Sequence, residues 1–156
     1  MKRRRVLEGF SIGLGTSLSG CTYFSQGNSH QLWFIRIFNS SVTSDSIEVR
    51  VSRDEEVVFE EQYEEIPSFR EDNGDKQNIR LISDGWEPSK GVYKIEYKIP
   101  DMSKLKERGI EQENEENIGI DLHILGGGMT GKSVSVNILE FESEQQVQYF
   151  LRGIDS

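Results

Sequence analysis

The sequence has little cysteine, histidine and proline. Of its 156 residues, one is cysteine, two are histidine and three are proline. A single cysteine excludes an internal disulfide. Two histidines are too few to favour a zinc site or a catalytic triad. No serine stands in a Gly-x-Ser-x-Gly elbow. We therefore expect a protein that is not an enzyme and has no catalytic residues, metal site or cofactor.

Positive charge is scarce beyond the first residues. The chain carries 18 basic and 27 acidic residues, which gives a formal net charge of −9. Four of the basic residues and one of the acidic residues stand among the first 20, so the remaining chain has a net charge of −12. Binding to nucleic acid, or to anionic lipid through charge, needs clustered lysine and arginine. We expect no nucleic acid partner.

The apolar run near the N-terminus is too short to be a stable transmembrane anchor. It covers residues 6–18, contains three glycines and Glu8, and falls short of the about 20 apolar residues that a bilayer requires. The basic stretch Lys2–Arg5 precedes it, and small residues follow it up to Cys21, the only cysteine. This order is typical of an export signal. The alternative is an unprocessed basic N-terminus on a cytosolic protein, with Cys21 as a core thiol.

The residues around the cysteine resemble a known class of signal. Leu18, Ser19, Gly20 and Cys21 are similar to the lipobox of exported lipoproteins. That resemblance implies cleavage before Cys21 and a lipid on its thiol, which would hold the protein at the outer face of the cell membrane. Each buried methylene of such a lipid contributes about 0.8 kcal/mol, so a two-chain lipid anchors stably.

The export route is also indicated by a resemblance. Arg3 and Arg4, followed by a weakly apolar segment, resemble the twin-arginine signal; Glu8 stands where that family often has lysine. Together with the acidic balance, this signal resembles secreted proteins of salt-loving archaea. An ordinary acidic extracellular domain is the alternative. We predict a signal peptide over residues 1–20, a lipidated tether over 21–30 and a folded domain over 31–156.

The folded part has the pattern of an all-β protein. Residues 47–52 alternate apolar and polar side chains, and residues 93–99 do the same. The acidic segment 101–117 predicts at most one helical turn, and residues 143–151 fit either a last strand or a short helix. We expect strands over Leu32–Phe38, Ile47–Ser52, Val57–Tyr63, Asn78–Ile82, Val92–Ile99, Ile118–Leu125 and Ser133–Phe141.

About seven strands with turns every ten or so residues indicate an antiparallel sandwich or barrel. The segment Ile47–Tyr63, followed by Trp86 and Gly91-Val92-Tyr93, resembles the immunoglobulin-like domains of small surface lipoproteins. The paired cysteines of antibody domains are missing. The resemblance implies an immunoglobulin-like β-sandwich, and a fold alone carries no function.

One string matches a phosphate-binding loop. Residues 126–133 fit G-x-x-x-x-G-K-S, with Gly126, Gly131, Lys132 and Ser133 at the defining positions. Such a loop needs a helix directly after it, because the backbone N–H groups at a helix N-terminus bind the phosphates. The residues that follow have the period of a strand. We therefore predict a hairpin turn here and disfavour nucleotide binding.

Three weaker candidates remain in the folded part. Asn39 opens an Asn-x-Ser sequon on an expected loop, a candidate site for N-glycosylation of a kind that is commonly unused. Trp33 and Trp86 fit either a sugar-stacking platform or aromatic packing, and we favour packing. The glutamates within residues 111–116 lack the spacing of a calcium loop, so we interpret them as solvated charge.

Three functions follow from these patterns. The favoured one is a lipid-anchored surface module that binds a protein, a glycan or a solute, or supports the envelope structurally. The second is an accessory subunit of a membrane transport or redox complex. The third and most remote is a nucleotide-binding protein that uses Lys132. The membrane, through the lipid on Cys21, is the partner that the sequence predicts; any protein or glycan partner is unidentified.

Overall fold

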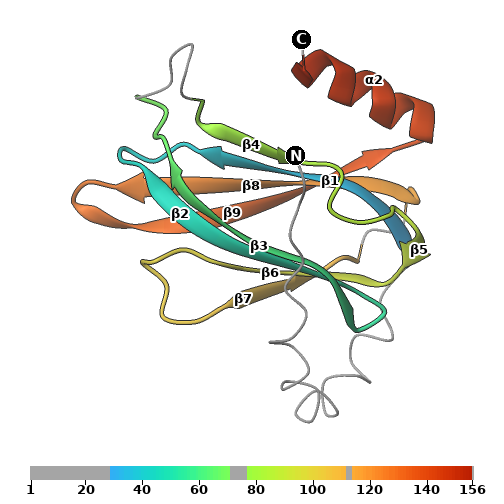
Figure 1. The fold of residues 1–156 in the computed structure, drawn as a ribbon, viewed down its shortest axis with the longest axis horizontal. Helices are drawn as coiled ribbons and strands as arrows, with labels where there is room; N and C mark the ends of the chain where they lie inside the picture. Colours follow the sequence, from blue (N-terminus) through green and yellow to red (C-terminus); the bar gives the residue numbers. More distant parts are fainter. Residues whose placement is uncertain (1–28, 71–76, 112–113, 156) are drawn as a thin grey trace.

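The computed structural model describes residues 29–70, 77–111 and 114–155. These residues form two β-sheets packed face to face, with one helix on the outside (Figure 1). The elements are β1 (His30–Asn39), β2 (Asp45–Arg53), β3 (Glu56–Ile66), β4 (Ile79–Ile82), β5 (Lys90–Gly91), β6 (Tyr93–Lys98), β7 (Lys106–Gly109), β8 (Asn117–Gly127), β9 (Thr130–Phe141) and α2 (Glu144–Asp155).

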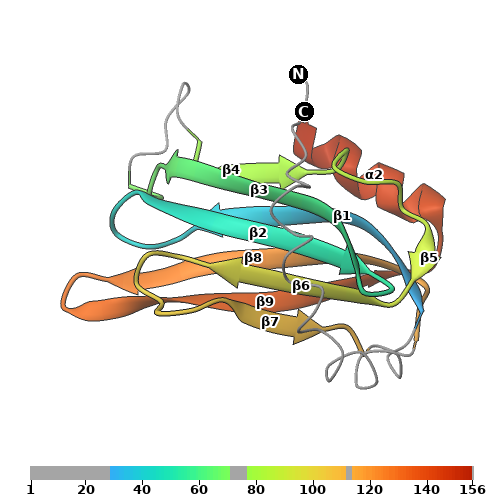
Figure 2. The same cartoon turned by 60° about the horizontal axis from the view of Figure 1, so that its bottom comes forward.

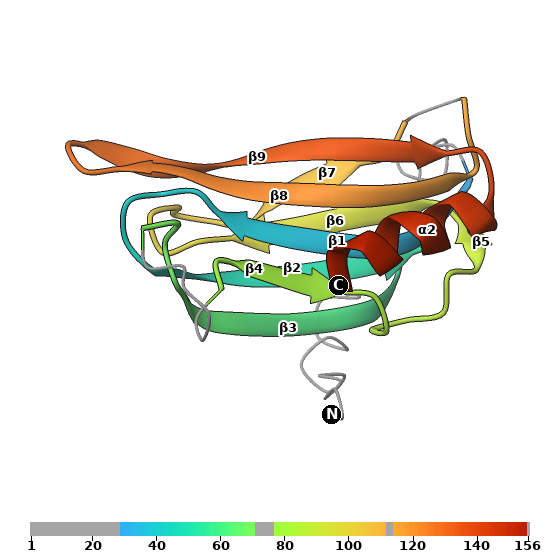
Figure 3. The same ribbon diagram turned by 90° about the horizontal axis from the view of Figure 1, so that it is seen from above.

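The first sheet has the strand order β4-β1-β8-β9, and the short strand β5 also pairs with β1. Strands β1 and β8 run parallel, whereas β1–β4, β1–β5 and β8–β9 are antiparallel. A parallel pair needs a long connection between its strands. Here the whole second sheet lies in sequence between β1 and β8. The chain crosses to the second layer and back twice, because β4 and β5 of the first sheet come between β3 and β6 (Figure 3).

The second sheet is antiparallel throughout, in the order β3-β2-β6-β7 (Figure 2). Its β2–β3 hairpin closes through Asp54 and Glu55, both with positive φ. Two consecutive residues of positive φ form the type of tight turn whose twist matches paired strands. The expected hairpin is therefore present, with two acidic residues in a turn that usually holds asparagine and glycine.

The core lies between the two sheets and follows the alternation of the sequence. Ile47, Val49 and Val51 of β2 are fully buried, and Tyr93 and Ile95 of β6 face the same layer. Fully burying one such side chain contributes roughly 1.5–3 kcal/mol. The predicted all-β sandwich is confirmed as two packed sheets, although the parallel β1–β8 pair departs from the purely antiparallel arrangement that we expected.

Strand β1 is covered on both of its faces, as its almost continuous apolar sequence predicts. Leu32, Ile35 and Ile37 point into the core between the sheets. A register shift between Leu32 and Phe34 turns Phe34 to the outer face, where it is also fully buried. The cover on that side is α2, so strand β1 lies in the interior of the molecule.

The C-terminal segment, for which the sequence fitted either a last strand or a short helix, forms helix α2. Val147, Phe150 and Leu151 lie on its inner side and pack against Phe34 of β1 and Phe141 of β9. Gln146 N–H donates to Ser143 Oγ at 3.2 Å, which caps the first turn. Over the described residues, no helix has both the length and the apolar character needed to cross a membrane.

Two strands were not predicted. Strand β5 has only two residues, and β7 consists of Lys106, Glu107, Arg108 and Gly109, which carry no apolar alternation. Instead of the helical turn expected near Met102, the chain makes a turn in which Met102 N–H donates to Ile99 O at 2.9 Å, and then pairs with β6. Charged side chains suit β7 because it lies at the edge of its sheet.

The sandwich has two ends with different contents. At the N-terminal end lie the first residue of β1, the β2–β3 turn and the last residue of β9. At the opposite end, here called the loop end, lie residues 40–44, the β8–β9 tip, the β6–β7 connection and the residues after β3 (Figure 1). Any group attached before His30 is therefore joined to the end that faces away from these loops.

Candidate functional site

The predicted export and lipidation residues lie outside the described part of the chain. These residues are Arg3, Arg4, Leu18, Ser19, Gly20 and Cys21. Their roles stay predictions from the sequence. The structure bears on them only through the position of His30, where the described fold begins its first strand.

The string that resembles a phosphate-binding loop forms the β8–β9 hairpin. Gly126, Gly127 and Gly128 have φ of 95°, 94° and 68°, a region that favours glycine. Strand β9 starts at Thr130, so Gly131, Lys132 and Ser133 belong to a strand. A helix N-terminus, which would collect N–H groups around a phosphate, does not follow the glycines. The hairpin predicted from the sequence is present.

Lys132 is held by the protein itself. Its Nζ lies 3.2 Å from Asp45 Oδ2 and donates to the carbonyl oxygens of Thr43 at 3.4 Å and Ser44 at 3.3 Å. Its backbone N–H donates to Asp101 Oδ2 at 2.9 Å. The side chains of Lys132 and Asp45 are 10% and 9% exposed. This lysine therefore joins three loops of the loop end and is poorly placed to reach a nucleotide phosphate.

Asn39 is buried rather than displayed. Its side chain is 0% exposed, and its Nδ2 donates to the carbonyl oxygens of Ile66 at 2.8 Å and Thr43 at 3.1 Å. Its Oδ1 accepts from the N–H and the hydroxyl of Ser41. A glycan on Nδ2 would remove at least one of these bonds and occupy core space. The geometry of the folded domain therefore disfavours glycosylation at this sequon.

Both tryptophans have structural roles. Trp33 Nε1 donates to Asn117 Oδ1 at 2.8 Å, which ties β1 to the start of β8. Trp86 Nε1 donates to Leu32 O at 2.8 Å, and its ring meets Phe59 edge-on at 5.4 Å. Their N–H groups and rings are used within the fold, as the packing interpretation predicted. They do not form a common sugar platform.

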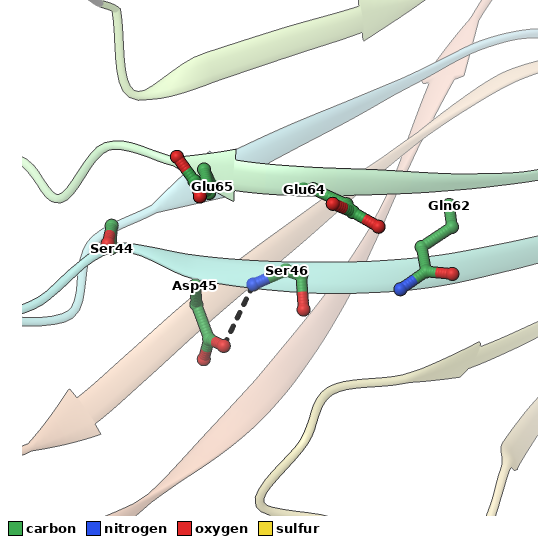
Figure 4. Close-up of a pocket in the computed structure, with 6 residues that line it drawn as sticks. All are labelled: Ser44, Asp45, Ser46, Gln62, Glu64 and Glu65. Carbon is green, nitrogen blue, oxygen red and sulfur yellow. Dashed lines mark hydrogen bonds between the residues drawn. The ribbon is translucent and has the colours of Figure 1, made fainter.

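A shallow depression of about 290 Å³ lies at the loop end between β2 and β3. Its lining is polar, and the carboxylates of Asp45 and Glu65 point away from each other rather than toward one centre (Figure 4). Within the described residues, no group of three or more histidine, cysteine, aspartate or glutamate side chains is placed to hold a metal ion. The lining residues are Ser44, Asp45, Ser46, Gln62, Glu64 and Glu65.

The exposed apolar side chains are concentrated at the loop end. Met129 at the β8–β9 tip is fully exposed, Phe69 after β3 is 49% exposed, and Leu125 of β8 is 39% exposed. The fourth large apolar side chain in this class, Tyr149, lies on α2. We did not single out these residues from the sequence, although an apolar side chain within a polar or glycine-rich turn is the signal that marks Phe69 and Met129. Together with the depression, Phe69, Leu125 and Met129 make the loop end the candidate binding surface.

A second polar feature lies on the outer face of the first sheet. Arg36 of β1 donates to Asp121 of β8 through Nε at 2.7 Å and through Nη2 at 2.6 Å. Its guanidinium also lies 4.5 Å from the centre of the Phe150 ring and 5.0 Å from that of Phe38. The charges of Arg36 and Asp121 are thus paired with each other. Because the guanidinium also contacts Phe150 of α2, this cluster stabilises the position of the helix.

The outer face of the second sheet carries a row of paired charges. Arg50 of β2 lies between Glu60 of β3 and Glu96 of β6, at 3.6 Å and 3.2 Å. Burial raises the pKa of the Glu60 carboxyl above its ordinary value, and the nearby Arg50 offsets part of that rise. Burial likewise raises the pKa of the Tyr93 hydroxyl. Neither group lies in the depression, so neither pKa indicates a catalytic site.

No protein-family model matches the chain, and no curated protein matches it in sequence.

Proposed function

We propose that this chain is a lipid-anchored protein of the outer cell surface, whose sandwich is a non-catalytic binding or structural module. The proposal rests on the order of features before the fold: the basic residues Lys2–Arg5, a short apolar run, and small residues that lead to Cys21. The fold supports the proposal because the two ends of the sandwich differ. The chain enters the sandwich at one end, and the exposed loops lie at the other.

The tether limits how far the N-terminal end of the sandwich can stand from the membrane. Cys21 stands nine positions before His30, the first residue of β1. Nine extended residues reach at most about 30 Å. A lipid on Cys21 would therefore keep the N-terminal end of the sandwich close to the membrane and let the loop end project outward. This placement would present Phe69, Leu125 and Met129 to a partner.

The anchor is tested by mass and location. We expect the protein extracted from membranes to have a mature mass that begins at Cys21 and includes a lipid. A Cys21→Ser variant should lose the lipid and be released from the membrane fraction. Full-length chain of unmodified mass in the cytosol would contradict the proposal, because neither cleavage nor lipid attachment would have occurred.

The binding surface is tested by paired substitutions. We expect the double variant Phe69→Ser with Met129→Ser to lose partners that cross-link to the anchored wild-type protein. Tyr149→Ser removes an exposed aromatic ring from α2 and serves as the matched control. Equal loss of cross-links in both variants would count against the loop end. A large membrane-spanning protein among the cross-linked partners would favour the accessory-subunit alternative.

The nucleotide alternative is tested by one titration. Lys132→Ala removes the side chain that a phosphate-binding loop requires. We expect no binding of ATP to either the wild-type chain or the variant, because the ammonium group of Lys132 is already paired with Asp45. ATP binding by the wild-type chain that is lost in the variant would restore this alternative.

A further inference from the structure

Strand β9 has an edge that no other described strand covers. It is the last strand of its sheet and pairs only with β8 within the described residues. It is also the longest strand, with 12 residues from Thr130 to Phe141. A long edge strand is a ready template for pairing with another chain, and most proteins protect such edges.

The other three edges of the sandwich have protection that β9 lacks. Strand β4 has four residues, and β7 has four residues of which three are charged. Strand β3 contains five glutamates and is paired with register shifts. By contrast, residues 133–139 of β9 read Ser-Val-Ser-Val-Asn-Ile-Leu, without charge, glycine or proline. The register with β8 is regular over this whole stretch.

The backbone groups that face outward can be identified from their neighbours. Lys132 N–H donates to Asp101 rather than to β8, and Gly126, its partner across the ladder, gives its carbonyl oxygen to Val42 N–H. Lys132 and Gly126 are thus a pair without mutual hydrogen bonds, and such pairs alternate along an antiparallel ladder. The N–H and C=O groups of Val134, Val136 and Ile138 therefore point to the open edge.

The side chains of the same three residues make this edge apolar on its inner side. Val134, Val136 and Ile138 are partly buried and pack against the margin of the core. Helix α2 does not cover them, because it lies on the other face of the same sheet, where it packs against Phe34 of β1 and against Leu139 and Phe141 of β9 (Figure 3). Within the described residues, this edge thus combines backbone groups that no strand pairs with apolar side chains that are only partly buried.

We propose that β9 pairs antiparallel with β9 of a second copy of this chain, with Val136 opposite the second copy's Val136. The edge is self-complementary in this register. Val134 then lies opposite the second copy's Ile138, so all three apolar side chains of each copy meet apolar side chains. Shifting the pairing by one step along the outward-facing residues would instead place Val134 opposite Glu140. The two first sheets join into one continuous sheet.

The test uses the full chain with Cys21→Ser, which has neither a lipid nor a native thiol. We expect light scattering to give twice the 17.9 kDa of one chain at high concentration. Val136→Pro should give the mass of one chain, because its outward N–H makes no bond to β8 and the fold can accept the ring. The circular dichroism spectrum of this variant should match that of the Cys21→Ser chain, which checks that the variant is folded.

Single cysteines test the register. In a hydrogen-bonded antiparallel pair the opposing Cα atoms are about 5.5 Å apart, within the range of a disulfide. We therefore expect Val136→Cys in the Cys21→Ser chain to form a covalent dimer on oxidation. Val134→Cys should not, since its two copies would be about 13 Å apart along the strands. Mixing Val134→Cys with Ile138→Cys should restore the cross-link.

Three results would overturn the proposal. The first is the mass of one chain at every concentration together with no cross-link at Val136. The second is a cross-link at Asn137 but not at Val136, which would show a different register. The third is equal cross-linking at Val136 and at Met129, a fully exposed position on the hairpin tip, since that would report random collision.

Discussion

Replacing Gly119 by alanine should destabilise the sandwich through one specific clash. Gly119 of β8 lies opposite Phe34 of β1, and a Cβ added there would stand 2.1 Å from Cζ of the Phe34 ring. Two further ring atoms would lie at 2.5 Å. Real Cβ atoms are not found at these distances, so the ring or the strand must move.

The ring of Phe34 has little room to move. It is 0% exposed and is stacked on Phe150 of α2 at 5.5 Å, with Phe141 of β9 at 5.9 Å on another side. Overpacking a closed site costs typically 1–3 kcal/mol. We expect the upper part of this range, about 3 kcal/mol, because moving the ring also loosens α2. For a domain of this size that lowers Tm by roughly 10 °C.

Thermal unfolding followed by circular dichroism measures this loss, and two variants serve as controls. Gly153→Ala makes the same change in α2, where an added Cβ meets nothing within 4 Å. It should raise stability by up to about 1 kcal/mol, because alanine favours a helix over glycine. Phe34→Leu combined with Gly119→Ala should recover part of the loss. An unchanged Tm for Gly119→Ala would refute the reasoning.

Three further substitutions test other parts of the fold. Glu55→Gly should stabilise the protein by about 0.5–1 kcal/mol in urea unfolding, because glycine adopts the positive φ of the turn without strain. Asp121→Asn should cost roughly 2–3 kcal/mol, since Arg36 then keeps a largely buried, unpaired charge; an unchanged midpoint would contradict this. Glu60→Gln tests the raised pKa of that carboxyl. Protonated Glu60 is favoured in the folded state, so its contribution is present below pH 4.5 and is lost as pH rises. The variant should therefore gain stability relative to wild type between pH 4 and pH 7, and an equal difference at both pH values would refute it.

The predictability of the fold follows from how each element is stabilised. Strands with one buried face, such as β2 and β6, show their burial in the alternation of Ile47, Val49 and Val51 or of Tyr93 and Ile95. The apolar sequence of β1 predicted a strand covered on both faces, but it did not predict that α2 covers the outer face. Helix α2 is held by contacts with β1 and β9, and a 12-residue segment of mixed pattern does not reveal these contacts.

The pairing of β1 with β8 and the edge strand β7 could not be predicted from the sequence for a different reason. The parallel β1–β8 pair joins residues more than 80 positions apart, and no local pattern encodes it. Strand β7 pairs through its backbone while its side chains are charged, so a pattern of side chains misses it. Asn39 was predicted to open a polar loop, but it is the buried last residue of β1, and the sequence does not reveal its hydrogen bonds to the carbonyl oxygens of Thr43 and Ile66. Backbone-mediated and long-range contacts limit what a single sequence reveals.

The proposed anchor and the proposed pairing constrain each other. Strand β9 runs from the loop end to the N-terminal end, so an antiparallel second copy would place its own N-terminal end beside the first copy's loops. The two tethers would then leave opposite ends of a joined sheet whose strands are about 40 Å long. Tethers that reach about 30 Å are shorter than these strands, so both can enter one membrane only if the strands tilt well away from the upright position. A single anchored chain is free to stand upright and a pair on one membrane is not, so pairing would tilt both loop ends away from the outward direction.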